Sequence, residues 1–290
     1  MSLISIGSTR HIDFIRNKLD NEFKLLQAEG VQINFHEKAS GDYTFLGYDI
    51  EANKNVNSNN LRTTFKQYVA KIISDLVIAK WEENLVARII KNNYSYFTIE
   101  EKNIILEKAL DILRNDDHIQ RKNKVLLKVL DYLENNDDLI IEGFIKFRLK
   151  EYLNDLEDVV DKAVDDFLME KEYNEFIRLL RYFVDIQDPR IDLVHVLLKP
   201  SGLFTLYDGN ENVISNEYLE GLIVDLPTDE INYDDLLISA LITIAPKRII
   251  LHAVKCKQTK NTVTTIQNVF GERVIVCEGC PKCKSSKFEL

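Results

Sequence analysis

The chain has 290 residues, of which 45% are hydrophobic and 29% are charged, with only ten Gly and five Pro. This composition excludes collagen-like, low-complexity and wholly disordered chains, and the scarcity of Gly and Pro favours long helices. The 37 basic and 47 acidic residues give a formal net charge of −10, which repels nucleic acid. The length predicts about two domains with ordinary hydrophobic cores.

The sequence indicates a cytoplasmic protein without membrane insertion. The first residues, MSLISIGSTRH, lack the basic start and apolar core of a secretory signal and predict a strand instead. The longest apolar stretch, Leu236 to Ala245, has about ten residues, whereas a membrane-spanning helix needs about 20. All four cysteines lie near the C-terminus, which is more typical of an intracellular metal or thiol site than of disulfides.

Residues 1–55 predict an N-terminal strand-helix-strand-strand unit. Segments with β-branched or alternating apolar residues predict strands at 2–7, 31–37 and 43–50. Between the first two strands, apolar residues recur at helical spacing and end near Gly30. A unit this small needs another part of the chain to pack against, and a sheet shared with the C-terminal domain is one way to provide it.

Residues 60–188 predict an all-helical bundle. From Leu61 onward apolar residues recur every 3.6 positions, and after a small drift Trp81 begins a continuation of the same helix. Thr98, followed three residues later by Glu101, forms a capping box that predicts the start of another helix. A further helix follows after a short loop, so these two helices are expected to be antiparallel neighbours.

A long helical segment is predicted between Gly143 and Pro189, where the chain contains no Gly or Pro. Its first apolar residues form one continuous stripe with an average step of about 3.67. They are Ile145, Leu149, Tyr152, Leu156, Val160, Ala163 and Phe167. A second apolar set begins at Tyr173 and is out of phase with the first, which predicts a bend or short break near residues 169–172.

Residues 190–283 predict a small α/β domain with a mixed sheet, and residues 284–290 a flexible tail. The expected elements are a strand hairpin at 191–198 and 203–207, a helix from about Asn216, a helix at 233–244 capped by Asn232, and a strand-helix-strand unit at 248–254, 260–269 and 273–277. This last unit is expected to be a right-handed parallel crossover. The whole chain is thus predicted to be a helix-rich α+β protein.

The four cysteines are the best candidates for a functional site. Cys277, Cys280 and Cys283 form a C-x2-C-x2-C run, and Cys256 follows the preceding strand. In a parallel crossover both strands end at the same edge of the sheet, so the four thiols are expected to converge. Such a set suits tetrahedral zinc, and three close thiolates with a distant fourth also suit an iron–sulfur cluster, so both stay open.

Other interpretations of these residues are open as well. The cysteines are also consistent with functionless reduced thiols, or with a C-x-x-C dithiol of weak redox activity. His252 could replace Cys256 as the fourth ligand, although a histidine in a strand is more often structural, and His195 is interpreted as structural too. Common phosphate-binding and hydrolytic motifs are absent, so no catalytic and no cofactor-binding residue is predicted.

Three stretches within residues 140–283 are distinctive: GFIKFRLKEYLNDLEDVVDKAVDDFLMEKEYNEFIRLLRYFVDIQDPR, NYDDLLISALITIAPKRIILH and CEGCPKC. With these stretches the chain resembles the YtxC-like family of sporulation-associated proteins from endospore-forming Firmicutes. The resemblance implies a cytoplasmic protein of spore-forming bacteria, without a defined biochemical activity. It transfers no catalytic or binding residue to this chain.

The sequence leads to two hypotheses about function. The first is a non-catalytic interaction or scaffold protein of sporulation, which binds protein partners and whose C-terminal domain is held by a metal or by thiols. The second is a metal- or thiol-dependent redox enzyme or sensor centred on the cysteines. Four thiolates fill the coordination of zinc completely, which favours the first hypothesis. Nucleic-acid binding has only the three lysines of the tail in its favour.

Overall fold

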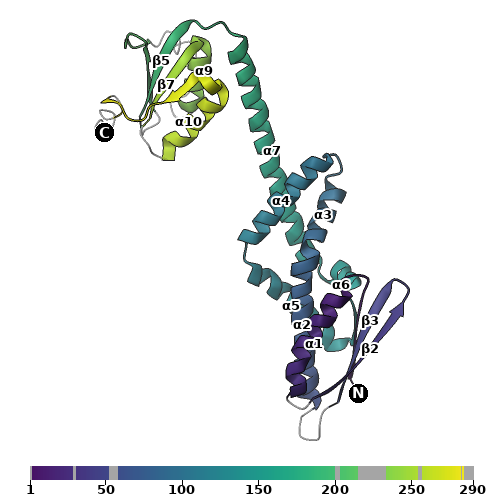
Figure 1. The fold of residues 1–290 in the computed structure, drawn as a ribbon. Coiled ribbons are helices and arrows are strands. Elements are labelled where there is room, and N and C mark those ends of the chain that lie inside the picture. Colours follow the sequence, from purple (N-terminus) through teal and green to yellow (C-terminus); the bar gives the residue numbers. More distant parts are fainter. Residues whose placement is uncertain are drawn as a thin grey trace. The chain divides into compact units, whose positions relative to one another are not determined.

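The computed structural model describes residues 2–28, 31–51, 58–199, 203–214, 233–253, 257–281 and 283. The chain forms two compact units, Met1–Leu168 and Met169–Leu290, which divide within one continuous helix, α7 (Lys150–Ile186). Figure 1 labels the helices and strands of each unit. Each unit has its own hydrophobic core. The helix-rich α+β class predicted from the sequence is confirmed. No helix in the described ranges is long and apolar enough to cross a membrane.

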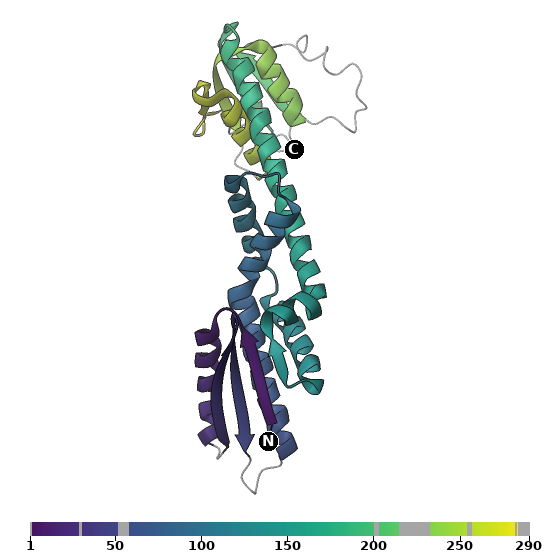
Figure 2. The ribbon, with the colours of Figure 1, turned by 90° about the vertical axis from the view of Figure 1, so that its right-hand side faces the viewer.

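The first unit contains a mixed sheet with strand order β2-β3-β1-β4. β1 (Ser2–Ser8), α1 (Ile12–Ala28), β2 (Gln32–Ser40) and β3 (Tyr43–Glu51) confirm the predicted N-terminal unit, and Figure 2 shows its strands lying over the helices. The short strand β4 (Asp138–Ile140) lies within the helical segment that follows and pairs parallel with β1. This pairing joins the N-terminal strands to the helical part of the same unit.

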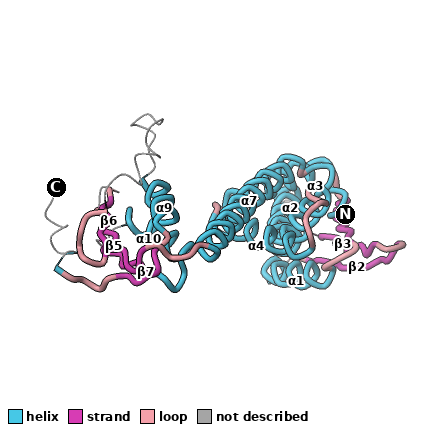
Figure 3. Tube along the Cα trace, turned by 90° about the horizontal axis from the view of Figure 1, so that it is seen from above, coloured by secondary structure: helices cyan, strands magenta, loops and turns pink. Residues whose placement is uncertain are grey.

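Helices make up most of the first unit (Figure 3). They are α2 (Ser58–Leu76), α3 (Glu82–Asn93), α4 (Ile99–Asn115), α5 (His118–Asn135), α6 (Ile141–Arg148) and the first half of α7. Strands and helices share one core, in which Ile4, Tyr48 and Phe65 are buried. The division into domains 1–55, 60–188 and 190–283 concerns independent folding and stays a prediction.

A π-helical turn, η1 (Val77–Trp81), joins α2 to α3. Leu76 and Trp81 are five positions apart, one more than an α-helix allows between neighbours on the same face. The wider π turn accommodates the extra residue, so both side chains still pack on the same core. The drift in the apolar spacing of the sequence is therefore the local signature of this turn.

The predicted capping box at the start of α4 is confirmed. The Thr98 hydroxyl accepts a hydrogen bond from the backbone N–H of Glu101 at 3.2 Å. The Glu101 carboxylate in turn accepts the backbone N–H of Thr98 at 2.9 Å. Two N–H groups that have no partner inside the helix are thus satisfied.

Helix α7 is continuous, so the break expected near residues 169–172 is wrong. The predicted stripe from Ile145 to Phe167 is buried in the first core, whereas Ile177 and Val184 are buried in the second. Phe167 and Ile177 are ten positions apart, which at about 100° per residue turns them onto faces about 80° apart. The change of phase therefore marks a change of packing partner along an uninterrupted helix.

The second unit has two layers, a mixed sheet and the helices that cover one face of it (Figure 1). The elements after α7 are β5 (Ile191–Leu198), β6 (Phe204–Asp208), α9 (Tyr233–Ile244), β7 (Pro246–Ala253), α10 (Lys257–Phe270), the 3-10 turn η3 (Gly271–Arg273) and β8 (Val274–Val276). The strand order is β6-β5-β7-β8, and this sheet is separate from that of the first unit.

The predicted pairing of the second sheet is confirmed where the structure describes it. β5 and β6 form the antiparallel hairpin, and β7 pairs parallel with both β5 and β8. The parallel β7–α10–β8 crossover is thus present. The helix expected from about Asn216 and the cap at Asn232 lie outside the described residues.

Glu82, Arg121 and Tyr152 form a buried polar network between α3, α5 and α7. The Tyr152 hydroxyl donates to a Glu82 carboxylate oxygen at 2.6 Å, and Arg121 Nε donates to the same oxygen at 3.3 Å. Burial raises the pKa of Tyr152 above its ordinary value, so the hydroxyl keeps its proton and remains a donor. Because a buried carboxylate without partners is costly, the network fixes how these three helices pack.

Replacing Arg121 should destabilise the first unit far more than removing an exposed arginine. Arg121→Met leaves Glu82 buried and without its cation, so we expect a loss of about 3–5 kcal/mol in the free energy of unfolding. Tyr152→Phe removes one donor and should cost about 1–2 kcal/mol. Urea unfolding followed by the fluorescence of Trp81, the single tryptophan, measures both.

Arg114→Met is the matched control for this prediction. Arg114 pairs with Asp111 at 2.7 Å, but both side chains are about two-thirds exposed to water, at 65% and 66%. Its loss should change stability by less than about 0.5 kcal/mol. Equal effects of the two substitutions would contradict a stabilising role for the buried network.

Candidate metal centre

The parallel strands of the second unit bring three chemically active segments to one edge of the sheet. His252 lies near the end of β7, and Cys277 directly follows β8. The backbone N–H of Cys277 donates to the carbonyl oxygen of Leu251 at 2.9 Å, which continues the ladder beyond the last residue of β8. His252 and Cys277 therefore leave the sheet side by side, as the crossover predicts for residues that follow neighbouring parallel strands.

A tight turn after β8 returns Cys280 and Cys283 to the same edge. Gly279 has a φ of 135°, a conformation that residues with a Cβ rarely adopt. The backbone N–H of Cys283 then donates to the carbonyl oxygen of Cys280 at 3.1 Å. The two Sγ atoms lie 3.8 Å apart, well beyond the S–S bond length of about 2.05 Å, so both are free cysteines.

His252 completes the group with its Nδ1 atom. Nδ1 lies 3.3 Å from Cys280 Sγ and 3.5 Å from Cys283 Sγ, and the His252 side chain is only 5% exposed. One ligand atom from each of His252, Cys277, Cys280 and Cys283 lies within 4.8 Å of all the others. These four residues could hold a metal ion.

The distances among His252, Cys280 and Cys283 fit the edges of a tetrahedron around a single ion. With Zn–S bonds of about 2.3 Å and Zn–N bonds of about 2.05 Å, a tetrahedral site has S···S edges of about 3.8 Å and N···S edges of about 3.6 Å. The S···S distance of 3.8 Å and the N···S distances of 3.3 and 3.5 Å agree with these edges. Three of the six distances between the ligand atoms thus match a tetrahedral ion, and the three that involve Cys277 are within 4.8 Å.

The thiols of this group differ in their tendency to ionise. A hydrogen bond from the backbone N–H of Gly279 is the main cause that lowers the pKa of Cys277 below its ordinary value. Burial raises the pKa of Cys283 to about 11. Metal ligation requires deprotonated thiols, so a cation that binds here displaces protons from the site.

Of the predicted ligands, Cys277, Cys280 and Cys283 are brought together, and Cys256 lies outside the described residues. His252, which the sequence analysis interpreted as a structural strand histidine, joins the group instead. The signal in the sequence for this role is the position of His252 near the end of the strand that precedes the crossover. The same topology that predicts convergence for Cys256 also places His252 at that edge.

His195 is a residue near this group whose position the sequence did not reveal. It lies on β5, and its Nδ1 atom is 3.0 Å from His252 Nε2. The two rings are nearly parallel, with an interplanar angle of 24° and centroids 5.3 Å apart. His252 is therefore contacted by sulfur atoms on one ring nitrogen and by a second imidazole on the other.

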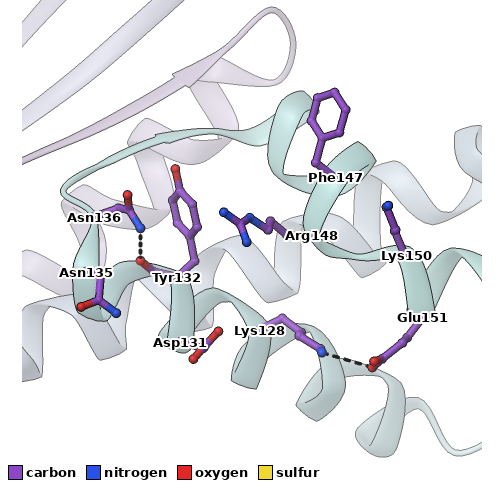
Figure 4. A pocket seen from close by; sticks show the side chains of 9 residues that line it. All are labelled: Lys128, Asp131, Tyr132, Asn135, Asn136, Phe147, Arg148, Lys150 and Glu151. Atoms are coloured by element: carbon purple, nitrogen blue, oxygen red, sulfur yellow. Dashed lines mark hydrogen bonds and ion pairs between the residues drawn. The ribbon is translucent and has the colours of Figure 1, made fainter.

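A surface hollow in the first unit is a weaker candidate site (Figure 4). It has a volume of about 510 Å³ and lies between the end of α5 and the junction of α6 with α7. Its charges are largely engaged with neighbours: Lys128 pairs with Glu151 at 3.2 Å, and the Arg148 guanidinium lies 5.7 Å from the centre of the Tyr132 ring. Its lining residues include no cysteine or histidine.

Comparison with known proteins identifies the family of the chain. The model of the YtxC-like family matches residues 67–275. The chain is 38% identical to "Uncharacterized protein YtxC" of Bacillus subtilis over 114 residues, which are 39% of this chain and 38% of that protein. The match thus spans well under half the length of that relative. No solved structure matches the chain. Since the family match covers well over half of the residues, the chain belongs to the YtxC-like family.

Proposed function

We propose that this protein is a non-catalytic interaction or scaffold protein of the cytoplasm, which acts in sporulation and whose second unit is stabilised by one structural zinc ion. The observation that carries the proposal is the convergence of His252, Cys277, Cys280 and Cys283, whose ligand atoms all lie within 4.8 Å of one another. One imidazole and three thiolates are a common ligand set of structural zinc. Reduced cysteines also support a cytoplasmic location.

The number of ligands supports a structural rather than a catalytic metal. Catalytic zinc keeps one coordination position open for water or substrate, whereas four protein ligands fill the tetrahedron. The short distances between the ligand atoms leave space for one ion and argue against a cluster of several iron and sulfide ions. A redox enzyme or sensor is the alternative that the metal identity would reveal.

An apolar surface on α7 supports the interaction role. In the second unit, five large apolar side chains of this helix are each between 47% and 60% exposed. They are Phe176, Leu179, Tyr182, Phe183 and Ile186. Neighbouring exposed apolar side chains of this size are typical of surfaces that bind another protein. The net charge of −10 supports a protein rather than a nucleic acid as the partner.

Elemental analysis of anaerobically purified protein tests the metal. We expect about one zinc per chain in the wild type and none in the Cys280→Ser, Cys283→Ser double variant, because serine is a poor zinc ligand. Cys256→Ser is the matched control, and it should retain the zinc if His252 supplies the fourth ligand. Iron with sulfide would support the redox alternative, and a wild type without metal would refute the structural zinc.

Removing the metal should loosen the edge of the second sheet selectively. β8 has only three residues, and Cys277 directly follows it. A metal bound by Cys277 and His252 would therefore link β8 to β7. With free zinc at 100 times Kd, its loss removes about 2.7 kcal/mol, which corresponds to about 100-fold faster amide exchange. Hydrogen exchange of the β7 and β8 amides before and after chelation measures this.

The sheet of the first unit is the internal reference for this experiment. The amides of β1 and β3 belong to a different sheet and core, so chelation should leave their exchange unchanged. Equal acceleration in both sheets would indicate general unfolding by the chelator. Unchanged exchange in β7 and β8 would show that the metal does not stabilise this edge.

Deletion of the gene in its host tests the sporulation role. We expect fewer heat-resistant spores at an unchanged rate of vegetative growth. Complementation with the wild-type gene should restore the spore count, and complementation with the Cys280→Ser gene should not if the metal is needed. Normal spore counts after deletion would refute a required role in sporulation.

A further inference from the structure

We propose that His195 is a positioning residue of the metal centre, which accepts a hydrogen bond from His252 and thereby directs His252 Nδ1 at the metal. The inference rests on the proposed metal site and adds a residue outside the ligand set. His195 does not touch the metal in this arrangement. By accepting the Nε2 proton of His252, it leaves the Nδ1 lone pair for the metal.

The parallel pairing of β5 with β7 creates the contact. His252 lies opposite Leu197 in the register, so His195 is two residues earlier on β5 and points to the same face of the sheet. The His195 Nδ1 to His252 Nε2 distance of 3.0 Å is that of a good hydrogen bond. The small interplanar angle of 24° keeps the N–H of one ring close to the lone pair of the other, since both lie in the ring planes.

Counting protons on the two rings gives the chemistry of this contact. A neutral imidazole has one N–H and one lone pair, so a hydrogen bond between two such rings needs one donor and one acceptor. If His252 donates from Nε2, its Nδ1 presents a lone pair toward Cys280 and Cys283, as a metal ligand must. His195 then accepts at Nδ1 and carries its own proton on Nε2.

The opposite arrangement blocks the site. If His195 donates from Nδ1, His252 must accept at Nε2 and carry its proton on Nδ1. That proton would point at the two sulfur atoms, which lie 3.3 and 3.5 Å away, and no lone pair would be left for a metal. Because His252 is 5% exposed, water does not readily replace His195 as the acceptor for its N–H group. His195 can therefore favour the state that binds metal.

Two substitutions at His195 separate an acceptor role from a packing role. His195→Phe keeps a ring of similar size but removes the acceptor, and we expect zinc affinity to fall about 10- to 100-fold. His195→Asn places an amide oxygen near the former position of Nδ1, so it should restore most of the affinity. Competition with a chromogenic chelator on the full chain measures zinc binding by all three proteins.

A spectroscopic measurement on the wild type tests the proton position directly. Long-range 1H–15N spectra of the zinc-loaded protein should show His252 bound through Nδ1 and protonated at Nε2. This measurement does not depend on the folding of a variant. Hydrogen exchange of the β5 amides checks that each variant keeps the sheet.

The outcomes distinguish the inference from the proposed function. A wild type that binds no zinc refutes the metal site itself. Zinc bound through His252 Nε2, or unchanged affinity in His195→Phe, overturns the role of His195 while the metal site stands. Equal losses in His195→Phe and His195→Asn with intact sheets also overturn it, because the retained acceptor would then have no effect.

Discussion

Helix α7 supplies buried side chains to both hydrophobic cores, so each unit needs this helix to complete its core. Its buried apolar side chains up to Phe167 belong to the first core, and Ile177 and Val184 belong to the second. The two buried faces are turned relative to each other, so the helix needs apolar residues in two phases. A segment without Gly or Pro lets one helix carry both phases, since neither residue weakens the backbone hydrogen bonds.

The two units use buried polar atoms in different ways. In the first unit, Glu82 is satisfied by hydrogen bonds from Arg121 and Tyr152, all contributed by helices that pack together. In the second unit, polar side chains gather at the end of β7 and β8, where their nitrogen and sulfur atoms face one another. A cation satisfies such a set of lone pairs better than hydrogen bonds among its members, because the members are mostly acceptors when deprotonated.

The proposed metal centre would compensate for the short edge of the second sheet. β8 is only three residues long and, among the described residues, pairs with β7 alone, so few backbone hydrogen bonds hold it. A metal that joins the turn after β8 to His252 would add covalent-like links at the same place. The contact from His252 to His195 would extend this connection across β7 to β5, so that three strands are linked beside the metal.

Most of the helices and strands and the cysteine cluster could be predicted from the sequence, because helical periodicity, capping and the C-x2-C spacing involve residues only a few positions apart. It also indicated convergence at one sheet edge, since parallel strands end together. The continuity of α7, the parallel pairing of β1 with β4 and the contact of His195 with His252 could be seen only in the folded chain. These depend on residues far apart in the chain, such as the two histidines, which are separated by 57 positions. Local patterns contain no information on which distant side chains the fold brings within hydrogen-bonding distance.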